Sequence, residues 1–214
     1  MRRLGPLALL LAVAACTLNP EGRTATPSPS PLPSGVANIN ETGDQTLAPG
    51  RYTRHDFAPR VTFDLDGEWY GRQVLQGYFT VQQGGERNPH VIALQFARPS
   101  GLFGSNGEEE PSDAADAAAI LETNPDFDVV ETSTSQMGGL EGSQITIENT
   151  SGDVVNLMRL PRGVIGLDPD RRLWIAFFDT DAGLLAIMVG GSIERWDEAL
   201  AAAEPVLESV QIEQ

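Results

Sequence analysis

The chain has 214 residues with 30 acidic and 14 basic side chains, and because every basic residue is Arg, the formal net charge of −16 includes no Lys. Such an acidic chain does not suit nucleic acid, since phosphate binding needs clustered Lys and Arg. One Cys and two His also exclude a disulfide framework, a Cys-rich zinc site and an iron–sulfur cluster. We therefore expect no nucleic-acid partner, no metal and no cofactor.

The first sixteen residues have the pattern of a secretory signal peptide. Two arginines precede an apolar run at residues 7–13, which is too short to span a membrane. Residues 13–16 resemble the bacterial lipobox, which implies cleavage between Ala15 and Cys16 and lipidation of Cys16. The alternative is an ordinary cleaved signal with an incidental Cys near its end. We predict a signal peptide at residues 1–15 and a lipid anchor on Cys16 that holds the protein at the cell membrane, outside the cytoplasm.

The composition changes after the leader. Residues 16–48 are rich in Thr, Pro and Ser and hold few large apolar side chains, so they cannot bury enough surface to offset chain entropy. We predict that they form a disordered tether. Residues 49–214 have the size of one ordinary domain, with no second linker and no internal repeat. One hydrophobic core is expected there.

The first half of this domain has the pattern of β-strands. Residues 61–66 alternate apolar and polar side chains before a turn at Gly67. Residues 75–82 and 90–97 are rich in Val, Ile, Tyr and Phe, which favour strands. The Gly- and Glu-rich residues 100–111 predict a long loop that follows the last of these strands.

A helix and then further strands are expected in the second half. Ser112 or Asp113 can cap a helix that runs through Leu121 and ends before Asn124-Pro125. The strands expected after it cover residues 127–132, 144–148, 154–159, 173–178 and 184–189. The turn residues 179–183 should join the last two as an antiparallel hairpin.

The chain ends on a second amphipathic pattern. Apolar residues at spacings of three and four predict one buried helix face: Ile193, Trp196, Leu200, Ala203 and Leu207. Pro205 should kink or interrupt this helix, and Val210 and Ile212 can form a short last strand or tail. Together the elements predict an α+β fold: a single domain with a largely antiparallel sheet packed with two main helices.

Several soft motifs carry a family resemblance. They are the helix that ends in Asn124-Pro125, the turn at residues 138–142 that leads into a strand, the apolar hairpin, and the ending at residues 203–210. With this order of elements, the domain resembles bacterial lipoprotein domains and, more distantly, the PsbP-like fold that includes the LpqN-type lipoproteins. The resemblance implies a helix–sheet–helix sandwich used mainly to bind proteins or small ligands. It supplies no catalytic residue.

The chemistry-bearing side chains do not form a recognisable catalytic motif. A hydrolytic triad needs a His near a nucleophile, and the two candidates, His55 and His90, have the positions of surface or strand-edge residues. Paired acidic residues at Asp64 and Asp66 and at two later turns do not complete a calcium loop. We expect them to be solvated strand and turn residues, and we assign no catalytic, cofactor-binding or metal-binding residue.

Two segments are candidates for a ligand or partner surface. Trp69 and Tyr70 follow the Gly67 turn, where an aromatic pair either seals the core or lines a groove. In the predicted loop, Leu102 and Phe103 lie between glycines as a candidate mobile apolar lip. The run Glu108, Glu109 and Glu110 is a candidate docking patch for a basic partner, unless these glutamates are simply solvated.

Two functional hypotheses follow from these features. The first is a lipid-anchored, extracytoplasmic binding or accessory module that is not an enzyme, with an envelope protein or a small apolar ligand as its partner. The alternative is an anchored enzyme that acts on envelope carbohydrate through paired carboxylates. A polar cleft with two convergent carboxylates of perturbed pKa would favour the enzyme, and a dry groove lined by aromatic side chains without such a pair would favour binding.

Overall fold

The computed structural model describes residues 32–39, 45–83 and 92–214. The predicted signal peptide, Cys16, most of the predicted tether and His90 lie outside these residues. Within the described ranges, no helix combines the length and the apolar character that a membrane crossing requires.

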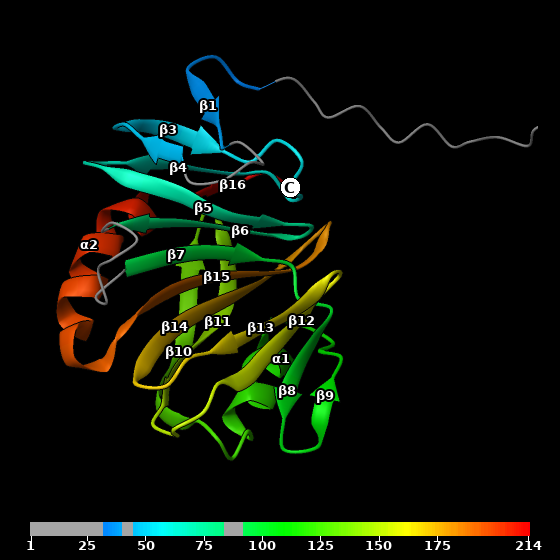
Figure 1. The fold of residues 1–214 in the computed structure, drawn as a ribbon. Helices are drawn as coiled ribbons and strands as arrows, with labels where there is room; N and C mark the ends of the chain where they lie inside the picture. Colours follow the sequence, from blue (N-terminus) through cyan, green and yellow to red (C-terminus); the bar gives the residue numbers. More distant parts are fainter. Residues whose placement is uncertain (1–31, 40–44, 84–91) are drawn as a thin grey trace, which may run out of the picture.

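A central sheet of eight strands runs through the molecule (Figure 1). Neighbouring strands in it are antiparallel, in the order β10-β11-β14-β15-β7-β6-β5-β2. In chain order the strands are β2 (Gln45–Leu47), β5 (Trp69–Leu75), β6 (Tyr78–Gln83), β7 (Ile92–Ala97), β10 (Asp128–Met137), β11 (Leu140–Asn149), β14 (Arg171–Thr180) and β15 (Gly183–Ser192).

The strands β14 and β15 form the predicted apolar hairpin at the centre of this sheet. Successive side chains of a strand point to opposite faces, so a continuous apolar run is buried on both sides. Leu173, Ile175 and Phe177 of β14 enter one core cluster, whereas Ala176 and Phe178 enter the other. The molecule therefore has two cores, one on each face of the central sheet.

One face of the central sheet is covered by a second sheet and by helix α2 (Trp196–Ser209). This sheet has the order β1-β3-β4-β16, and only its β1–β3 pairing is parallel. Its strands are β1 (Val36–Asn38), β3 (Gly50–Thr53), β4 (Val61–Leu65) and β16 (Gln211–Ile212). Four aromatic rings fill the space between the two sheets, with centroids 4.6–6.3 Å apart: Phe57, Phe63, Phe79 and Phe96.

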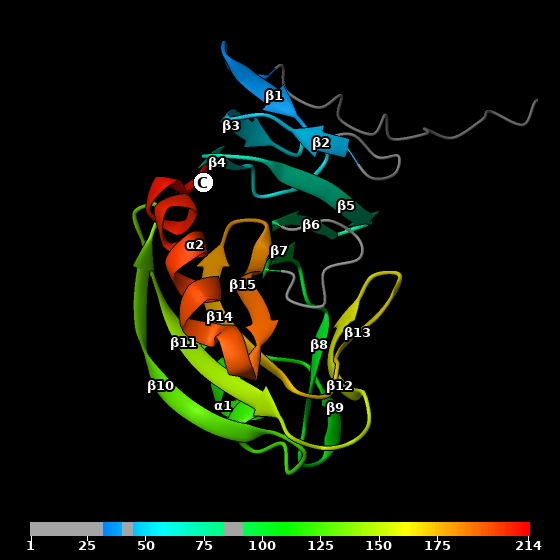
Figure 2. The ribbon, with the colours of Figure 1, turned by 60° about the vertical axis from the view of Figure 1, so that its left-hand side comes forward.

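The opposite face is covered by helix α1 (Ala114–Glu122) and a third sheet (Figure 2). This sheet has the order β13-β12-β8-β9. Its strands are β8 (Gly101–Gly104), β9 (Gly107–Glu109), β12 (Val155–Leu160) and β13 (Gly163–Leu167). Asp113 caps α1 as predicted, because its side chain accepts a hydrogen bond from the Asp116 amide at 2.8 Å.

Two sequence predictions about irregular segments are wrong. The ordered structure begins before residue 49, since β1 and β2 lie within the predicted tether, and Ile39 after β1 and Leu47 of β2 are almost completely buried. The predicted loop at residues 100–111 is mostly the hairpin β8–β9, which closes through Ser105-Asn106 and is followed by Gly107 at a φ of +92°. Short apolar or Gly-rich strands gain their stability from neighbouring strands, which a composition argument does not include.

The closing helix differs from its prediction in detail. A short 3-10 turn, η1 (Ile193–Arg195), precedes α2, and Pro205 lies inside a helix that continues to Ser209. Leu200 is exposed, and the buried face consists of Trp196, Ala199, Ala203 and Val206. The predicted last strand is confirmed, because Gln211 and Ile212 pair with β4.

The predicted fold class is confirmed in its main features: the sheets are largely antiparallel and two main helices pack on them. The structure differs in the number of sheets, which is three instead of one. The helices have 9 and 14 residues, so strands dominate the fold.

Candidate functional site

The two aromatic residues predicted as a surface, Trp69 and Tyr70, are consecutive in β5 and therefore point to opposite faces of the strand. Trp69 is 1% exposed, and its indole N–H donates to the Asp66 carbonyl at 2.9 Å, so it seals the core and is not a ligand surface. Tyr70, on the other face of β5, is half-buried. Adjacent charge on Glu68 raises the pKa of the Tyr70 hydroxyl.

The predicted lip and docking patch belong to the β8–β9 hairpin. Leu102 is fully buried, which contradicts a mobile lip, whereas Phe103 is half-buried. Glu108 forms an ion pair with Arg159, with Arg159 Nη2 2.7 Å from Glu108 Oε2, and this pairing lowers the pKa of Glu108. Glu109 is partly buried and Glu110 is exposed. Figure 1 shows β8 and β9 at the lower end of the molecule and β5 in its upper half, so the two predicted surfaces do not form one site.

A different site arises where several turns meet at one end of the central sheet. The register brings them together, because Ala97 pairs with both Tyr78 and Ala186, and Gly101 pairs with Arg159. Two backbone hydrogen bonds of 2.8 Å fix the junctions, one from the Arg98 amide to the Gly77 carbonyl and one from the Ser100 amide to the Arg159 carbonyl.

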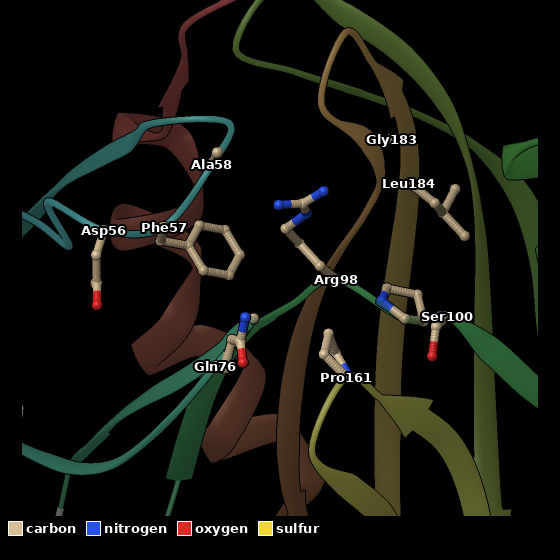
Figure 3. Close-up of a pocket in the computed structure, with 11 residues that line it drawn as sticks. Asp56, Phe57, Ala58, Gln76, Arg98, Ser100, Pro161, Gly183 and Leu184 are labelled. Carbon is tan, nitrogen blue, oxygen red and sulfur yellow. The ribbon is translucent and has the colours of Figure 1, made fainter. Parts of the chain in front are cut away.

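These turns enclose two adjoining cavities of about 290 and 570 Å3, which share Asp56, Phe57, Gln76 and Gly77 in their walls. We call the two together the loop cleft. Its walls come from the segments 54–58, 74–78, 98–100, 161–162 and 183–184. Figure 3 shows the Arg98 side chain between Phe57 and the Gly183 turn, with Gln76 and Pro161 below it in this view.

The segment 54–58 is held in place by a buried arginine and an aromatic ring. Arg54 is 3% exposed; its Nη1 donates to the Ile39 carbonyl at 2.9 Å, and its Nη2 donates to Asp56 Oδ2 at 2.7 Å. Phe57 packs edge-on against Phe79, with ring centroids 5.0 Å apart. The cleft wall is therefore attached to the core, and the charge of Asp56 is already paired.

Two of the three arginines in the cleft walls, Arg98 and Arg162, differ from the other described arginines. Six described arginines form ion pairs with carboxylates: Arg51, Arg54, Arg60, Arg159, Arg172 and Arg195. Arg171 lies within reach of the charge of Asp168. Within the part of the chain that the structure describes, Arg98 and Arg162 form no ion pair, and both line the loop cleft. Asp56 is the one carboxylate among the described lining residues.

Tyr78 forms part of the wall of the larger cavity and remains neutral. It is 5% exposed, and its hydroxyl donates to Gln95 Oε1 at 2.7 Å. Burial raises the pKa of this hydroxyl well above its ordinary value near 10. Tyr78 is therefore a hydrogen-bonding wall residue and not a base.

This pKa shift predicts a loss of stability in alkali. Because the pKa is raised in the folded state, the stabilising contribution is complete below about pH 10 and decreases as the pH rises above that value. Tyr78→Phe should cost about 1 kcal/mol at pH 7 but lose less stability than the parent between about pH 9 and 11. Urea unfolding at each pH measures both effects, and an unchanged alkaline slope in the variant would contradict the assignment.

A further cavity of about 450 Å3 lies between α1 and the strands β10 and β11, with Asp113, Glu141 and Asp179 in its wall. These carboxylates make it a candidate for the pair that the enzyme hypothesis requires. Asp113 and Asp179 instead accept hydrogen bonds from the first amides of α1, at 2.8 Å from Asp116 N and 3.1 Å from Ala114 N. Across the described ranges, no three His, Cys, Asp or Glu side chains are grouped in a way that could hold a metal ion.

Of the two histidines weighed for a hydrolytic triad, only His55 lies within the described residues. The His55 amide donates to Asn38 Oδ1 at 2.9 Å, so this residue joins β1 to the β3–β4 segment. His90 lies outside the described residues.

The comparisons with known proteins give little beyond this geometry. No protein-family model matches the chain, and no curated protein matches its sequence. One solved structure to which the chain is similar is the solution structure of cyanobacterial PsbP (CyanoP) from Synechocystis sp. PCC 6803. The two are 12% identical, the TM-score is 0.44, and the match covers 82% of this chain and 95% of that one.

The sequence analysis did not identify Arg98, Arg162 or Gln76 as site residues. A weak signal was present, because each lies beside a Pro or Gly at a turn that follows a strand: Gln76-Gly77, Arg98-Pro99 and Pro161-Arg162. Turns that are separated by an even number of antiparallel strands lie at the same end of a sheet. The pairing of β8 with β12, which adds the last of these turns, has no sequence signal of this kind.

Proposed function

We propose that this chain is a lipid-anchored binding module, displayed outside the cytoplasm, that holds a ligand in the loop cleft and performs no chemistry on it. The observation that supports this most strongly is the cleft itself. Loops from five parts of the chain form its walls, and one of them, the segment 54–58, is tied to the core by Arg54 and Phe57. A preformed concave site of this kind favours binding without a large ordering cost.

The chemistry of the walls favours a polar ligand over the small apolar one that the sequence suggested. Gln76, Ser100 and the arginines supply hydrogen-bond donors, while Phe57 and Leu184 supply apolar contact area. A few polar groups in fixed positions within a partly apolar site are typical of small-molecule sites.

The location rests on the leader of the sequence. The lipobox-like residues before Cys16 support cleavage and lipidation, and the resulting anchor would keep the domain at the outer side of the cytoplasmic membrane. A binding module at this place would meet envelope components or imported solutes.

The test is whether filling the cleft abolishes ligand retention. Gln76 is exposed at a two-residue turn and borders both cavities, so Gln76→Trp should fill the cleft without disturbing the core. Asn106→Trp is the matched control, because Asn106 also precedes a Gly in an exposed hairpin turn and lies outside the cleft walls.

The full chain in detergent is incubated with a small-molecule extract of its own cell envelope, dialysed, and analysed by mass spectrometry. We expect the parent and Asn106→Trp to retain the same compound and Gln76→Trp to lose it at least tenfold. Equal retention by all three proteins, or no retained compound in the parent, would contradict the proposal.

A further inference from the structure

We propose that the ligand of the loop cleft carries a small oxyanion group, a phosphate or a carboxylate, which Arg98 and Arg162 bind. This inference rests on the proposed function and assigns the chemical class of the ligand. A guanidinium presents several N–H donors in one plane and matches the oxygens of either group.

Arg98 is held in position by hydrogen bonds that leave most of its guanidinium N–H donors available for a ligand. Its backbone is fixed at the end of β7 by the hydrogen bond to Gly77, and one of its guanidinium nitrogens, Nη2, donates to the Ala182 carbonyl. A guanidinium has five N–H donors, so this bond orients the group and leaves most of its donors available. Figure 3 shows the guanidinium in the space between Phe57 and Gly183, where a ligand in the smaller cavity would meet it.

Arg162 adds a second positive charge from another turn. It is exposed in the turn between β12 and β13, and it borders the larger cavity together with Gln76. The two cavities adjoin, and the described carboxylate in their walls, Asp56, is paired with Arg54. The cleft therefore carries a local positive charge that the described protein groups do not neutralise.

This local charge is notable because acidic residues outnumber basic ones about two to one, and six other described arginines have carboxylate partners. Leaving two arginines unpaired in one concavity is favourable if an anion binds there. The net charge of −16 also limits the size of that anion. A polyanion would be repelled by the rest of the surface, whereas a small molecule with one or two negative charges is affected mainly by the groups it touches.

The test compares three probes of similar size at constant ionic strength: glycerol phosphate, glucuronate and glucose. Binding to the full chain in detergent is measured by thermal shift and calorimetry. We expect at least one charged probe to bind and glucose not to bind. Binding of the first or the second probe distinguishes a phosphate ligand from a carboxylate ligand.

The variants locate the binding. Arg98→Gln and Arg162→Gln should each weaken the charged probe about ten- to hundredfold, as expected for loss of a charge-assisted hydrogen bond. Arg195→Gln is the control, because Arg195 pairs with Glu198 at the start of α2, away from the cleft walls, and this variant should bind like the parent. Arg162 is exposed in a turn, so Arg162→Gln tests the inference even if Arg98→Gln does not fold.

The outcomes separate this inference from the proposed function. If glucose binds as well as the charged probes, or if Arg162→Gln binds the charged probe like the parent, the oxyanion assignment is wrong. The oxyanion assignment is also wrong if the compound that the parent retains from the envelope extract, and that Gln76→Trp loses, is neutral. That result would still support the proposed binding function. If no probe binds and the parent retains no compound, both are wrong.

Discussion

Gly142→Ala should destabilise the fold by about 3 kcal/mol, at the upper end of the usual cost of overpacking. A Cβ at Gly142 would overlap the Phe177 carbonyl oxygen of β14 and lie 2.7 Å from Cδ1 of Phe178. The first of these atoms belongs to the backbone of the central strand, and Phe178 is fully buried, so neither neighbour can move away at low cost. The strands β11 and β14 would have to separate.

Thermal unfolding of the full chain measures this effect. A loss of about 3 kcal/mol corresponds to a decrease in Tm of roughly 6–12 °C for a chain of this size. Gly152→Ala is the matched control, since a Cβ there meets no atom within 4 Å, and its Tm should change by little. A Gly142→Ala variant as stable as Gly152→Ala would show that β11 and β14 do not approach as closely as described.

Cys16→Ser should move the protein from the membrane fraction to the soluble fraction, or leave its signal peptide uncleaved. Burial of acyl chains contributes about 0.8 kcal/mol per methylene, and two chains give stable anchoring where one gives only marginal binding. Cleavage before Cys16 would remove Arg2 and Arg3, making the remaining chain more acidic than the −16 of the full sequence. Anionic lipid would repel such a chain, so it could not replace the lipid as an anchor.

Fractionation of cells in low and in high salt measures this relocation, with mass spectrometry of the N-terminus to detect the lipid. The unfolding transition of Cys16→Ser should match that of the parent, which separates loss of the anchor from loss of the fold. Processed Cys16→Ser protein that stays with membranes in high salt would show that the anchor lies elsewhere.

Regular patterns in the sequence predicted the centre of the fold well. The continuous apolar runs around the turn at 179–183 gave the hairpin of β14 and β15, and alternation at 61–66 gave β4. Asp113 and the following alanines gave α1. These elements have strong local signals, because strands buried on both faces need apolar side chains at every position and helices need caps.

The segments that were missed depend on partners distant in sequence. The strand β8 contains two glycines in four residues and pairs with β12, more than fifty residues later, so its composition alone indicates a loop. Likewise β1 and β2 follow a Pro-rich stretch, yet Ile39 and Leu47 pack into a core formed by later strands. Burial by non-local pairing overrides local propensity at these positions.

The candidate site could not be predicted for the same reason. Gln76, Arg98 and Arg162 lie at three separate turns, and an isolated Arg in a turn normally indicates a solvated surface residue. Their convergence depends on the register of β6 with β7 and of β8 with β12. In the described ranges, Arg98 and Arg162 have no carboxylate partner, whereas six other arginines do. This difference is visible only in the structure.

Hydrogen–deuterium exchange of the full chain, with and without the small-molecule extract of its own envelope, tests most directly whether the loop cleft is the binding site. The binding account predicts slower exchange in the cleft segments 54–58, 74–78, 98–100, 161–162 and 183–184. The edge strand β10, which pairs with β11 on one side and is exposed along most of its length, should exchange at an unchanged rate. Slower exchange confined to β10, with the cleft segments unchanged, would contradict it.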